Sequence, residues 1–553
     1  MSNFFTRSKD DMKYLFKNKE ELSKKERKRK RRGWGTLIGL ILVLIQLIVS
    51  GLLLFNIFKL DILPLKYLIA VNAFLLLIFL YDFTSQFTKA HIIGKILAVL
   101  MSGVIVFIYL VSSKLDSVLN KLNLPEINTD IVDVVVLADD KASSLNDLAN
   151  YKFAYNSTAS NANVKTAFDS VKSELNKSSL ELAEYKSWDD LVTAFYDNTE
   201  VQAIVMNDSM LKVVASQYED FDTKVKIIKQ FEYKKLVTVQ KSNVNVKKEP
   251  FIIYVSGISS DDGGDFQLQN NALSDVNILA VVNPETKQIL LVTTPRDSYI
   301  KITGPDGRKG YDKLTHAGNY GVNMSIDTIK NLLNIDINYY IRVNFSTVEK
   351  IIDSLRGVDV YSEYSFVSYI DNYKFYKGYN HMNGKQALAF SRERKTLPSG
   401  DIDRGRNQEA VIEAIIRKAT SSEIIYNYPT ILKNTKNSFQ TNLTDKDITS
   451  LIKKELTNLG GWNVTSNVIT GEGKLDYTYS YPTQKLYVMN INNESLNKTI
   501  NLINKVINGD KLDSSYGQPG NIKNPDKVIV TEPSQDTEKP KEDSKDNDTK
   551  DNV

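Results

Sequence analysis

Residues 276–297, VNILAVVNPETKQILLVTTPRD, contain two apolar runs separated by an Asn-Pro turn. This pattern predicts a hairpin of two buried strands. The second run ends abruptly in Pro295, Arg296 and Asp297, and α/β sheets place their ligands at such strand ends. We therefore expect an α/β sheet with a ligand site where the second strand ends.

A second charged stretch occupies 383–409, NGKQALAFSRERKTLPSGDIDRGRNQE, between two apolar helical patterns. Its polar side chains include Arg392, Arg394, Arg404, Arg406, Asp401, Asp403 and Gln408. Arginine stays charged, and its planar fork matches two phosphate oxygens at once. The cluster predicts a site for a multiply charged phosphate. The alternative is a solvated loop in which the arginines pair with neighbouring carboxylates.

Strand and helix patterns alternate over 246–510. Strand patterns cover 251–257, 337–345 and 358–361, and helix patterns cover 325–334, 346–357, 384–390, 406–419 and 444–456. Mixed strands with helices on both faces predict an α/β/α layered domain with a mixed central sheet. Ser346 and Glu349 have the spacing of a capping box, and Gly357 is placed to end that helix in the left-handed conformation.

Five short segments of this domain match known signatures in order and spacing. They are SD at 274–275, PRDSY at 295–299, KLTHAG at 313–318, GKQALAFSRER at 384–394 and GDIDRGRNQ at 400–408. Together they resemble the LytR-CpsA-Psr family of cell-envelope proteins. The resemblance implies a membrane-anchored phosphotransferase that moves a glycopolymer phosphate from a polyprenyl-pyrophosphate carrier to a peptidoglycan hydroxyl. The polymer would be teichoic acid, capsule or a similar glycan.

The resemblance also assigns roles to individual residues. The pyrophosphate would be held by Arg296, Lys313, Arg392, Arg394, Arg404 and Gln408. Asp275 would bind Mg²⁺, and Asp297 or Asp401 would orient an arginine or accept the acceptor's proton. Phosphoryl transfer needs mainly positioning and charge neutralisation, which arginines and a divalent cation supply. Mg²⁺ is favoured because carboxylate and phosphate oxygens are hard ligands.

Two positions depart from the family pattern. Ser259 stands where the family has a metal-binding aspartate, and Leu273 stands where it has a phosphate-binding arginine. The loop between them contains Asp261, Asp262 and Asp265. Either one of these replaces the missing carboxylate, or the loop is merely hydrophilic. The competing hypothesis is therefore a catalytically weakened relative that binds lipid-linked polymer or recruits partners in cell-wall assembly. Turnover distinguishes the two.

The N-terminal part of the 553-residue chain predicts a membrane anchor. Apolar runs at 37–58, 67–81 and 92–113 predict three transmembrane helices within 34–114. The basic run KKERKRKRR at 24–32 should keep residues 1–33 in the cytoplasm, so that the main domains lie outside the cell. Because it adjoins a membrane helix, we interpret this run as a topology signal and expect no nucleic-acid partner.

The remaining segments carry no catalytic pattern. Residues 120–245 alternate strand and helix patterns and predict a small α/β accessory domain, in which Ser187 and Asp190 have capping-box spacing. A spacer, partner-docking or ligand-binding role for this domain stays open. Residues 511–553 have few large apolar side chains and predict a disordered tail. The chain has no cysteine, which excludes disulfides and thiolate sites.

Overall fold

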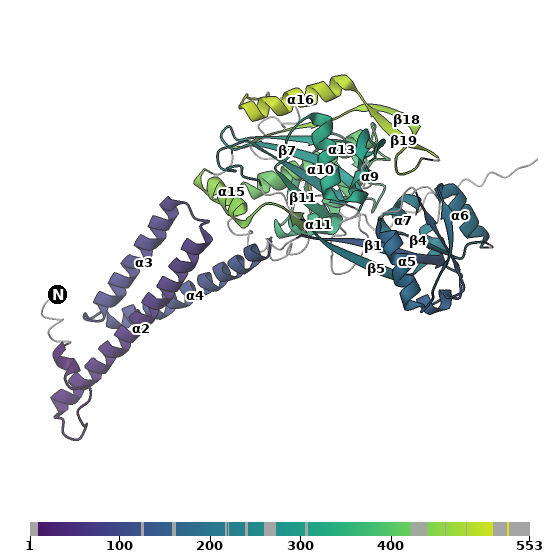
Figure 1. Ribbon diagram of the computed structural model, residues 1–553. Coiled ribbons are helices and arrows are strands. Elements are labelled where there is room, and N and C mark those ends of the chain that lie inside the picture. Colours follow the sequence, from purple (N-terminus) through teal and green to yellow (C-terminus); the bar gives the residue numbers. More distant parts are fainter. Residues whose placement is uncertain are drawn as a thin grey trace, which may run out of the picture.

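The computed structural model in Figure 1 shows a helical anchor followed by two α/β units. It describes residues 9–512, apart from 123–125, 158–161, 199, 216–217, 219–220, 238–241, 259–271, 305–307, 422–430, 432–438, 459–460 and 483, together with 528–529. The predicted disordered tail, 511–553, lies outside the described residues except for 511–512 and the short strand β20 (Val528–Ile529).

Three long helices form the N-terminal anchor. They are α2 (Lys24–Leu60), α3 (Leu65–Ser85) and α4 (His91–Leu122). In the described part of the chain, these three helices are long and apolar enough to cross a membrane. They pack on one another through Leu53, Leu75 and Ile105, while large apolar side chains cover their outer faces. The basic run 24–32 forms the first turns of α2, with Ser23 as its capping residue.

The accessory domain is a five-stranded sheet with the strand order β3-β2-β4-β1-β5. Its strands are β1 (Glu126–Leu137), β2 (Lys152–Asn156), β3 (Glu181–Tyr185), β4 (Ala203–Asn207) and β5 (Val225–Val237). Its helices are η1 (Leu145–Leu148), α5 (Ala162–Glu174), α6 (Trp188–Asp197), α7 (Asp208–Ala215) and α8 (Phe221–Lys224). The Ser187 hydroxyl accepts hydrogen bonds from the amides of Asp189 and Asp190, as its predicted capping role requires. The predicted α/β class is confirmed.

The central sheet of the second unit has six strands in the order β16-β11-β6-β7-β8-β17. They are β6 (Phe251–Ile258), β7 (Ser274–Asn283), β8 (Gln288–Thr293), β11 (Tyr339–Asn344), β16 (Phe439–Thr441) and β17 (Asn463–Val468). β7 and β8 are antiparallel, which confirms the predicted hairpin. β6–β11 and β8–β17 are parallel pairs, so the sheet is mixed.

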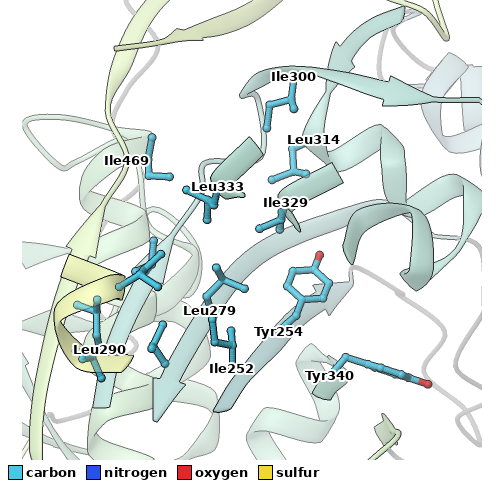
Figure 2. Close-up of a cluster of buried hydrophobic side chains, with 14 of the residues drawn as sticks. Ile252, Tyr254, Leu279, Leu290, Ile300, Leu314, Ile329, Leu333, Tyr340 and Ile469 are labelled. Atoms are coloured by element: carbon cyan, nitrogen blue, oxygen red, sulfur yellow. The ribbon is translucent and has the colours of Figure 1, made fainter. Parts of the chain in front are cut away.

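Helices cover both faces of this sheet. α10 (Val322–Leu333) and α16 (Asn493–Asn508) pack on one face in a core that includes Tyr254, Leu279 and Leu290 (Figure 2). The other face is covered by α13 (Asp401–Ala419) and α15 (Asp445–Thr457). α11 (Phe345–Ser354) and α12 (Gly384–Arg392) pack beside α13 in a separate cluster. The predicted α/β/α layering is confirmed.

Short hairpins and helical turns complete the unit. They are β9 (Tyr299–Thr303), β10 (Lys309–Lys313), α9 (Leu314–Ala317), η2 (Gly318–Tyr320), β12 (Val358–Ser362), β13 (Phe366–Val367), β14 (Lys374–Phe375), β15 (Gly378–Met382), β18 (Gly471–Tyr477) and β19 (Lys485–Ile491). The β9–β10 and β18–β19 pairs are antiparallel. Both pairs lie close to the turn that follows β8, because β9 starts at Tyr299 and β19 bridges to Ser298.

The predicted capping box of Ser346 and Glu349 is wrong. The capping residue of α11 is Asn344, whose side-chain oxygen accepts a hydrogen bond of 2.9 Å from the amide of Thr347. Asparagine is among the best capping residues, and it ends β11 directly before the helix. The predicted left-handed conformation of Gly357 is confirmed, with φ of 86°.

The predicted start of the last arginine-bearing helix at 406 is also wrong. α13 begins at Asp401, directly after Gly400, which has a positive φ of 51°. Two acidic residues in the first turn, Asp401 and Asp403, favour this start because they interact well with the positive end of the helix dipole. Arg404 and Arg406 therefore stand on a helix instead of a loop.

The α/β units share apolar packing, and the second unit also contacts the anchor. Tyr481 and Leu486 are buried in the core of the accessory domain with Trp188, and Leu273 packs against the same cluster. The Tyr481 hydroxyl donates a hydrogen bond of 3.2 Å to the Tyr218 hydroxyl. On the anchor side, Lys453 of α15 lies 2.6 Å from Asp61, in the turn between α2 and α3.

Candidate active site

A chain of ion pairs joins two strand ends of the central sheet. Asp275 is the second residue of β7, and Arg296 and Asp297 lie in the turn after β8. Arg296 Nη1 lies 2.7 Å from Asp275 Oδ1, and Arg296 Nε lies 3.7 Å from Asp297 Oδ2. Lys313 Nζ, at the end of β10, lies 3.1 Å from Asp297 Oδ1. Four of the residues singled out from the sequence are therefore in contact at one end of the neighbouring strands β7 and β8.

The helical stretch adds its arginines to the same place. A cavity of about 300 Å³, here called the arginine cavity, is lined by Asp275, Val276, Arg296, Phe345, Tyr369, Ile370, Arg392, Glu393, Arg394, Lys395, Arg404 and Gln408. Five of the six residues expected to hold a pyrophosphate thus line one cavity. Lys313 is not among its described lining residues, and it contacts the site through Asp297. Asp401 pairs directly with Arg404.

Positive charge dominates the arginine cavity. Its described lining holds five cationic side chains and two carboxylates. One of these carboxylates, Glu393, already accepts hydrogen bonds from backbone amides. Burial raises the pKa of Glu393, but hydrogen bonds from backbone amides, including those of Tyr369 and Thr396, outweigh burial and lower it. Because like charges gathered at one site repel one another, and arginine pairs well with phosphate oxygens, this arrangement favours binding of a multiply charged anion.

Arg296 and Arg404, the two least exposed arginines of the arginine cavity, respond differently to their surroundings. Burial lowers the pKa of Arg404, and the nearby Arg296 lowers it further, while Asp401 opposes both effects. Burial also lowers the pKa of Arg296, but attraction to Asp275 and Asp297 outweighs it, so that the pKa is raised. Of the two, the charged form of Arg404 would therefore be stabilised more by a bound phosphate.

Cation–π contacts hold two further cations of the cavity in place. The Arg392 guanidinium carbon lies 4.8 Å from the ring centroid of Phe345, and Lys395 Nζ lies 3.6 Å from that of Tyr369. Such contacts restrict long side chains without neutralising them. The charge of Arg392 is therefore positioned at the cavity wall before a ligand arrives.

Arg406 does not join the cluster that the sequence suggested. Its Nη1 lies 2.8 Å from Asp403 Oδ1 and 3.8 Å from Glu363 Oε2. Because residues of an α-helix are spaced by about 100°, Arg404 and Gln408 share one face, and Arg406 points to another. The alternative interpretation of this stretch, arginines paired with neighbouring carboxylates, therefore applies to Arg406.

Two histidines of the second α/β unit, His316 and His381, lie outside the arginine cavity. His316 is buried, and its Nδ1 lies 2.6 Å from Asp312 Oδ1 and 2.8 Å from Ser480 Oγ. His381 Nδ1 lies 2.7 Å from Asp359 Oδ1, on the β12–β15 pair. Neither is among the described residues that line the arginine cavity. Both contacts favour a structural role.

The described residues fit Mg²⁺ in one specific way. They contain no group of three or more His, Cys, Asp or Glu side chains that could form a complete metal site. Mg²⁺ often takes only one or two carboxylates and completes its shell with phosphate oxygens and water. Asp275, with one oxygen on Arg296, suits that use. Ser259, Asp261, Asp262 and Asp265 lie outside the described residues.

Sequence reasoning missed Glu409, which holds α13 against the end of β8. Its carboxyl group is buried, and Oε1 accepts hydrogen bonds from the Thr293 amide (3.1 Å) and hydroxyl (2.8 Å). Burial raises the pKa of Glu409 to about 8. Gly405, four residues earlier, faces the same strand, and a Cβ atom there would lie 3.1 Å from Thr293 Cγ2. The spacing of Gly405 and Glu409, four residues apart on one helix face, was the available sequence signal for this contact.

The part of the chain that contains this site is similar to known proteins. Residues 213–498 match the sequence profile of the LytR_cpsA_psr family. The polyisoprenyl-teichoic acid–peptidoglycan teichoic acid transferase TagU of Enterococcus faecalis is 34% identical over 251 residues, 45% of this chain and 80% of that protein. The chain belongs to the LytR-CpsA-Psr family. TagU of Bacillus subtilis is 37% identical over 200 residues, 36% of this chain and 61% of that protein.

A similar solved structure of the family is "TagT bound to LIIa-WTA". Its sequence is 26% identical, and the match covers 49% of this chain and 97% of that one, with a TM-score of 0.39. The anchor and most of the accessory domain precede the part of the chain that matches the LytR-CpsA-Psr profile.

We expect Glu409→Gln to flatten the pH dependence of stability. Folding raises the pKa of Glu409 from 4.5 to about 8. The contribution of the protonated Glu409 to stability is therefore full below about pH 4.5 and is lost as the pH rises to about 8. Each unit of pKa difference corresponds to about 1.4 kcal/mol. Denaturant unfolding of the full chain at pH 5, 6.5 and 8 measures this slope.

The exposed Glu494 of α16 provides the matched control, because Glu494→Gln should retain the wild-type slope. Equal slopes for wild type and Glu409→Gln would contradict a protonated Glu409 in the folded protein.

Proposed function

We propose that this chain transfers a glycopolymer phosphate, teichoic acid among the candidates, from a polyprenyl-pyrophosphate carrier to peptidoglycan. The observation that carries the proposal is the arginine cavity, where five cations surround a space of about 300 Å³ at a sheet edge. The TagU relatives are named as transferases of teichoic acid to peptidoglycan, and they match this domain. A pyrophosphate supplies the multiple negative charges that such a cavity favours.

The transfer exchanges one phosphorus–oxygen bond for another. The acceptor hydroxyl oxygen attacks the phosphorus on the glycan side of the pyrophosphate, and the bond from that phosphorus to the bridging oxygen breaks. Polyprenyl phosphate leaves with the bridging oxygen, while the acceptor's proton passes to Asp297 or Asp401. Arg296, Arg392 and Arg404 neutralise the charge on the phosphate oxygens, which is the main need of phosphoryl transfer.

Asp275 is the residue that would hold Mg²⁺, and the ion would add charge neutralisation at the phosphate oxygens. Arg296 also contacts Asp275, at 2.7 Å. This pair therefore orients the carboxylate whether or not the ion is bound. Because Asp275 stands at the start of β7, its position is fixed by the central sheet.

The second candidate function is a binding protein that retains lipid-linked polymer without consuming it. The observation that favours it is Leu273, which stands where the family has a phosphate-binding arginine and packs against the accessory core. One cation of the family's set is thereby missing from the site. Release of polyprenyl phosphate by the purified chain separates the two functions.

We place the chain in the cell membrane, with the N-terminus in the cytoplasm and both α/β units outside. Three spanning helices and the basic start of α2 support this orientation. Contact between α15 and the turn after α2 would keep the catalytic unit near the outer surface, where a lipid-linked donor is anchored.

We expect Arg392→Ala and Arg404→Ala to weaken binding of a polyprenyl pyrophosphate by about 1.5 to 3 kcal/mol each, because each removes a charge-assisted hydrogen bond. Titration of the detergent-solubilised chain with the lipid measures this loss. Arg406→Ala is the matched control, since Arg406 lies on α13 with Arg404 but pairs with Asp403. Equal affinity in all three variants would reject the arginine cavity as the pyrophosphate site.

Transfer should require Mg²⁺ and depend on Asp275. With a lipid-linked glycan donor and a peptidoglycan acceptor, EDTA should stop release of polyprenyl phosphate, and Mg²⁺ should restore it. Asp275→Asn should need more Mg²⁺ for half-maximal activity because a neutral amide is a weaker ligand. Mass spectrometry of the released lipid follows the reaction. Absence of turnover at every Mg²⁺ concentration would leave the binding-protein function in its place.

Protease added to intact cells should digest the chain beyond residue 120 and spare a tag placed at Ser2. This outcome follows from an odd number of crossings after a cytoplasmic N-terminus. Immunoblots against the tag and against the C-terminal domain give the result. Protection of the C-terminal domain until the cells are lysed would contradict the orientation.

A further inference from the structure

A second cavity of about 300 Å³, here called the carboxylate cavity, adjoins the arginine cavity. Its lining includes Asp297, Ser399, Asp401, Gly471, Tyr487 and Met489. Asp297 and Asp401 are the ion-pair partners of Arg296 and Arg404, which line the arginine cavity. The two cavities therefore share a wall, with arginines on one side and carboxylates on the other.

Tyr487 lines the carboxylate cavity and is 55% exposed. Two residues further along β19, the Met489 amide donates a hydrogen bond of 2.8 Å to the carbonyl oxygen of Asp297. The Tyr487 ring lies over Gly473 of the paired strand, where a Cβ atom would be 2.7 Å from the ring. The strand that carries Tyr487 is therefore joined to Asp297, and one face of the ring is packed against Gly473.

The chemistry of this cavity differs from that of its neighbour. None of its described lining residues is Lys or Arg, so these residues offer no positive charge to a phosphate. It offers instead an aromatic face, two carboxylates and the Ser399 hydroxyl. A sugar ring matches these groups, because it has an apolar face of C–H groups and a rim of hydroxyl donors. The volume lies at the lower end of ligand pockets, roughly 300 to 1,000 Å³.

We propose that the carboxylate cavity binds a sugar ring of the acceptor glycan, with the ring stacked on Tyr487. This inference rests on the proposed function. In phosphoryl transfer the attacking and leaving oxygens lie roughly in line with phosphorus. With the pyrophosphate among the arginines, the shared wall is where an attacking hydroxyl meets both the phosphorus and a carboxylate.

Asp401 is the carboxylate better placed to receive the acceptor's proton. Its side chain is 33% exposed, whereas that of Asp297 is 13% exposed and lies 3.1 Å from Lys313. Asp297 is therefore more enclosed, and it is held by cations on two sides. Asp401, at the first turn of α13, has a more accessible carboxylate and one cationic partner, Arg404.

The test measures transfer by the full chain in detergent, with a polyprenyl-pyrophosphate-linked saccharide as donor and an uncross-linked peptidoglycan oligosaccharide as acceptor. Tyr487→Ala should raise the acceptor KM about tenfold and leave the donor KM unchanged, since only the stacking surface is lost. Tyr487→Trp should retain acceptor binding. Tyr311→Ala is the matched control, because Tyr311 is 53% exposed on β10 and is not among the described cavity residues.

An unchanged acceptor KM in Tyr487→Ala, or an equal rise in Tyr311→Ala, would overturn the proposal. A rise confined to the donor KM would also overturn it, by assigning the cavity to the donor's own glycan. If wild type shows no transfer, the proposed function fails, and saturation-transfer NMR with the oligosaccharide alone still tests the cavity. Contact in wild type that is retained in Tyr487→Leu, which keeps apolar bulk without the ring, would then reject ring stacking.

Discussion

The hydrogen bonds from Thr293 to Glu409 join α13 to the end of β8, and the position of the site depends on this junction. Three residues after Thr293 the chain reaches Arg296, and five residues before Glu409 it passes Arg404. Both arginines therefore take their position from one buried contact. The close approach at Gly405 leaves little room for α13 to move away from the strand.

Electrostatics then divide the site into two sides. Arg296 and Arg404, the least exposed arginines of the arginine cavity, each have a carboxylate partner that lines the carboxylate cavity, Asp297 and Asp401 respectively. Arg296 also pairs with Asp275, which lines the arginine cavity. A cluster of arginines without such partners would repel itself and would be costly to bury. The carboxylates thus stabilise the folded protein before substrate binds. They leave several cations of the arginine cavity, among them Arg392 and Arg394, for a phosphate.

The sequence predicted the layers, the hairpin and most of the polar residues that the structure brings together in the arginine cavity, because these depend on local patterns. Apolar runs identify strands, and PRDSY and GDIDRGRNQ are short motifs that keep their order in the chain. It did not predict that Arg406 would turn away, because that depends on where α13 begins. Glu409 was missed because a glutamate in a charged helix shows its burial only when the helix is placed against a strand. Tyr487 was missed for a similar reason, since its hairpin approaches Asp297 from almost 200 residues away.

The packing of Leu273 on the accessory domain gives a physical reason for an apolar residue at this position. Leu273 lies two residues before Asp275, and Tyr481 and Leu486 share the same apolar contact. Without the accessory domain, this patch beside the active site would face water, where an arginine is the more soluble choice. By covering Leu273, the accessory domain makes this edge of the second unit part of an apolar interface between the two units.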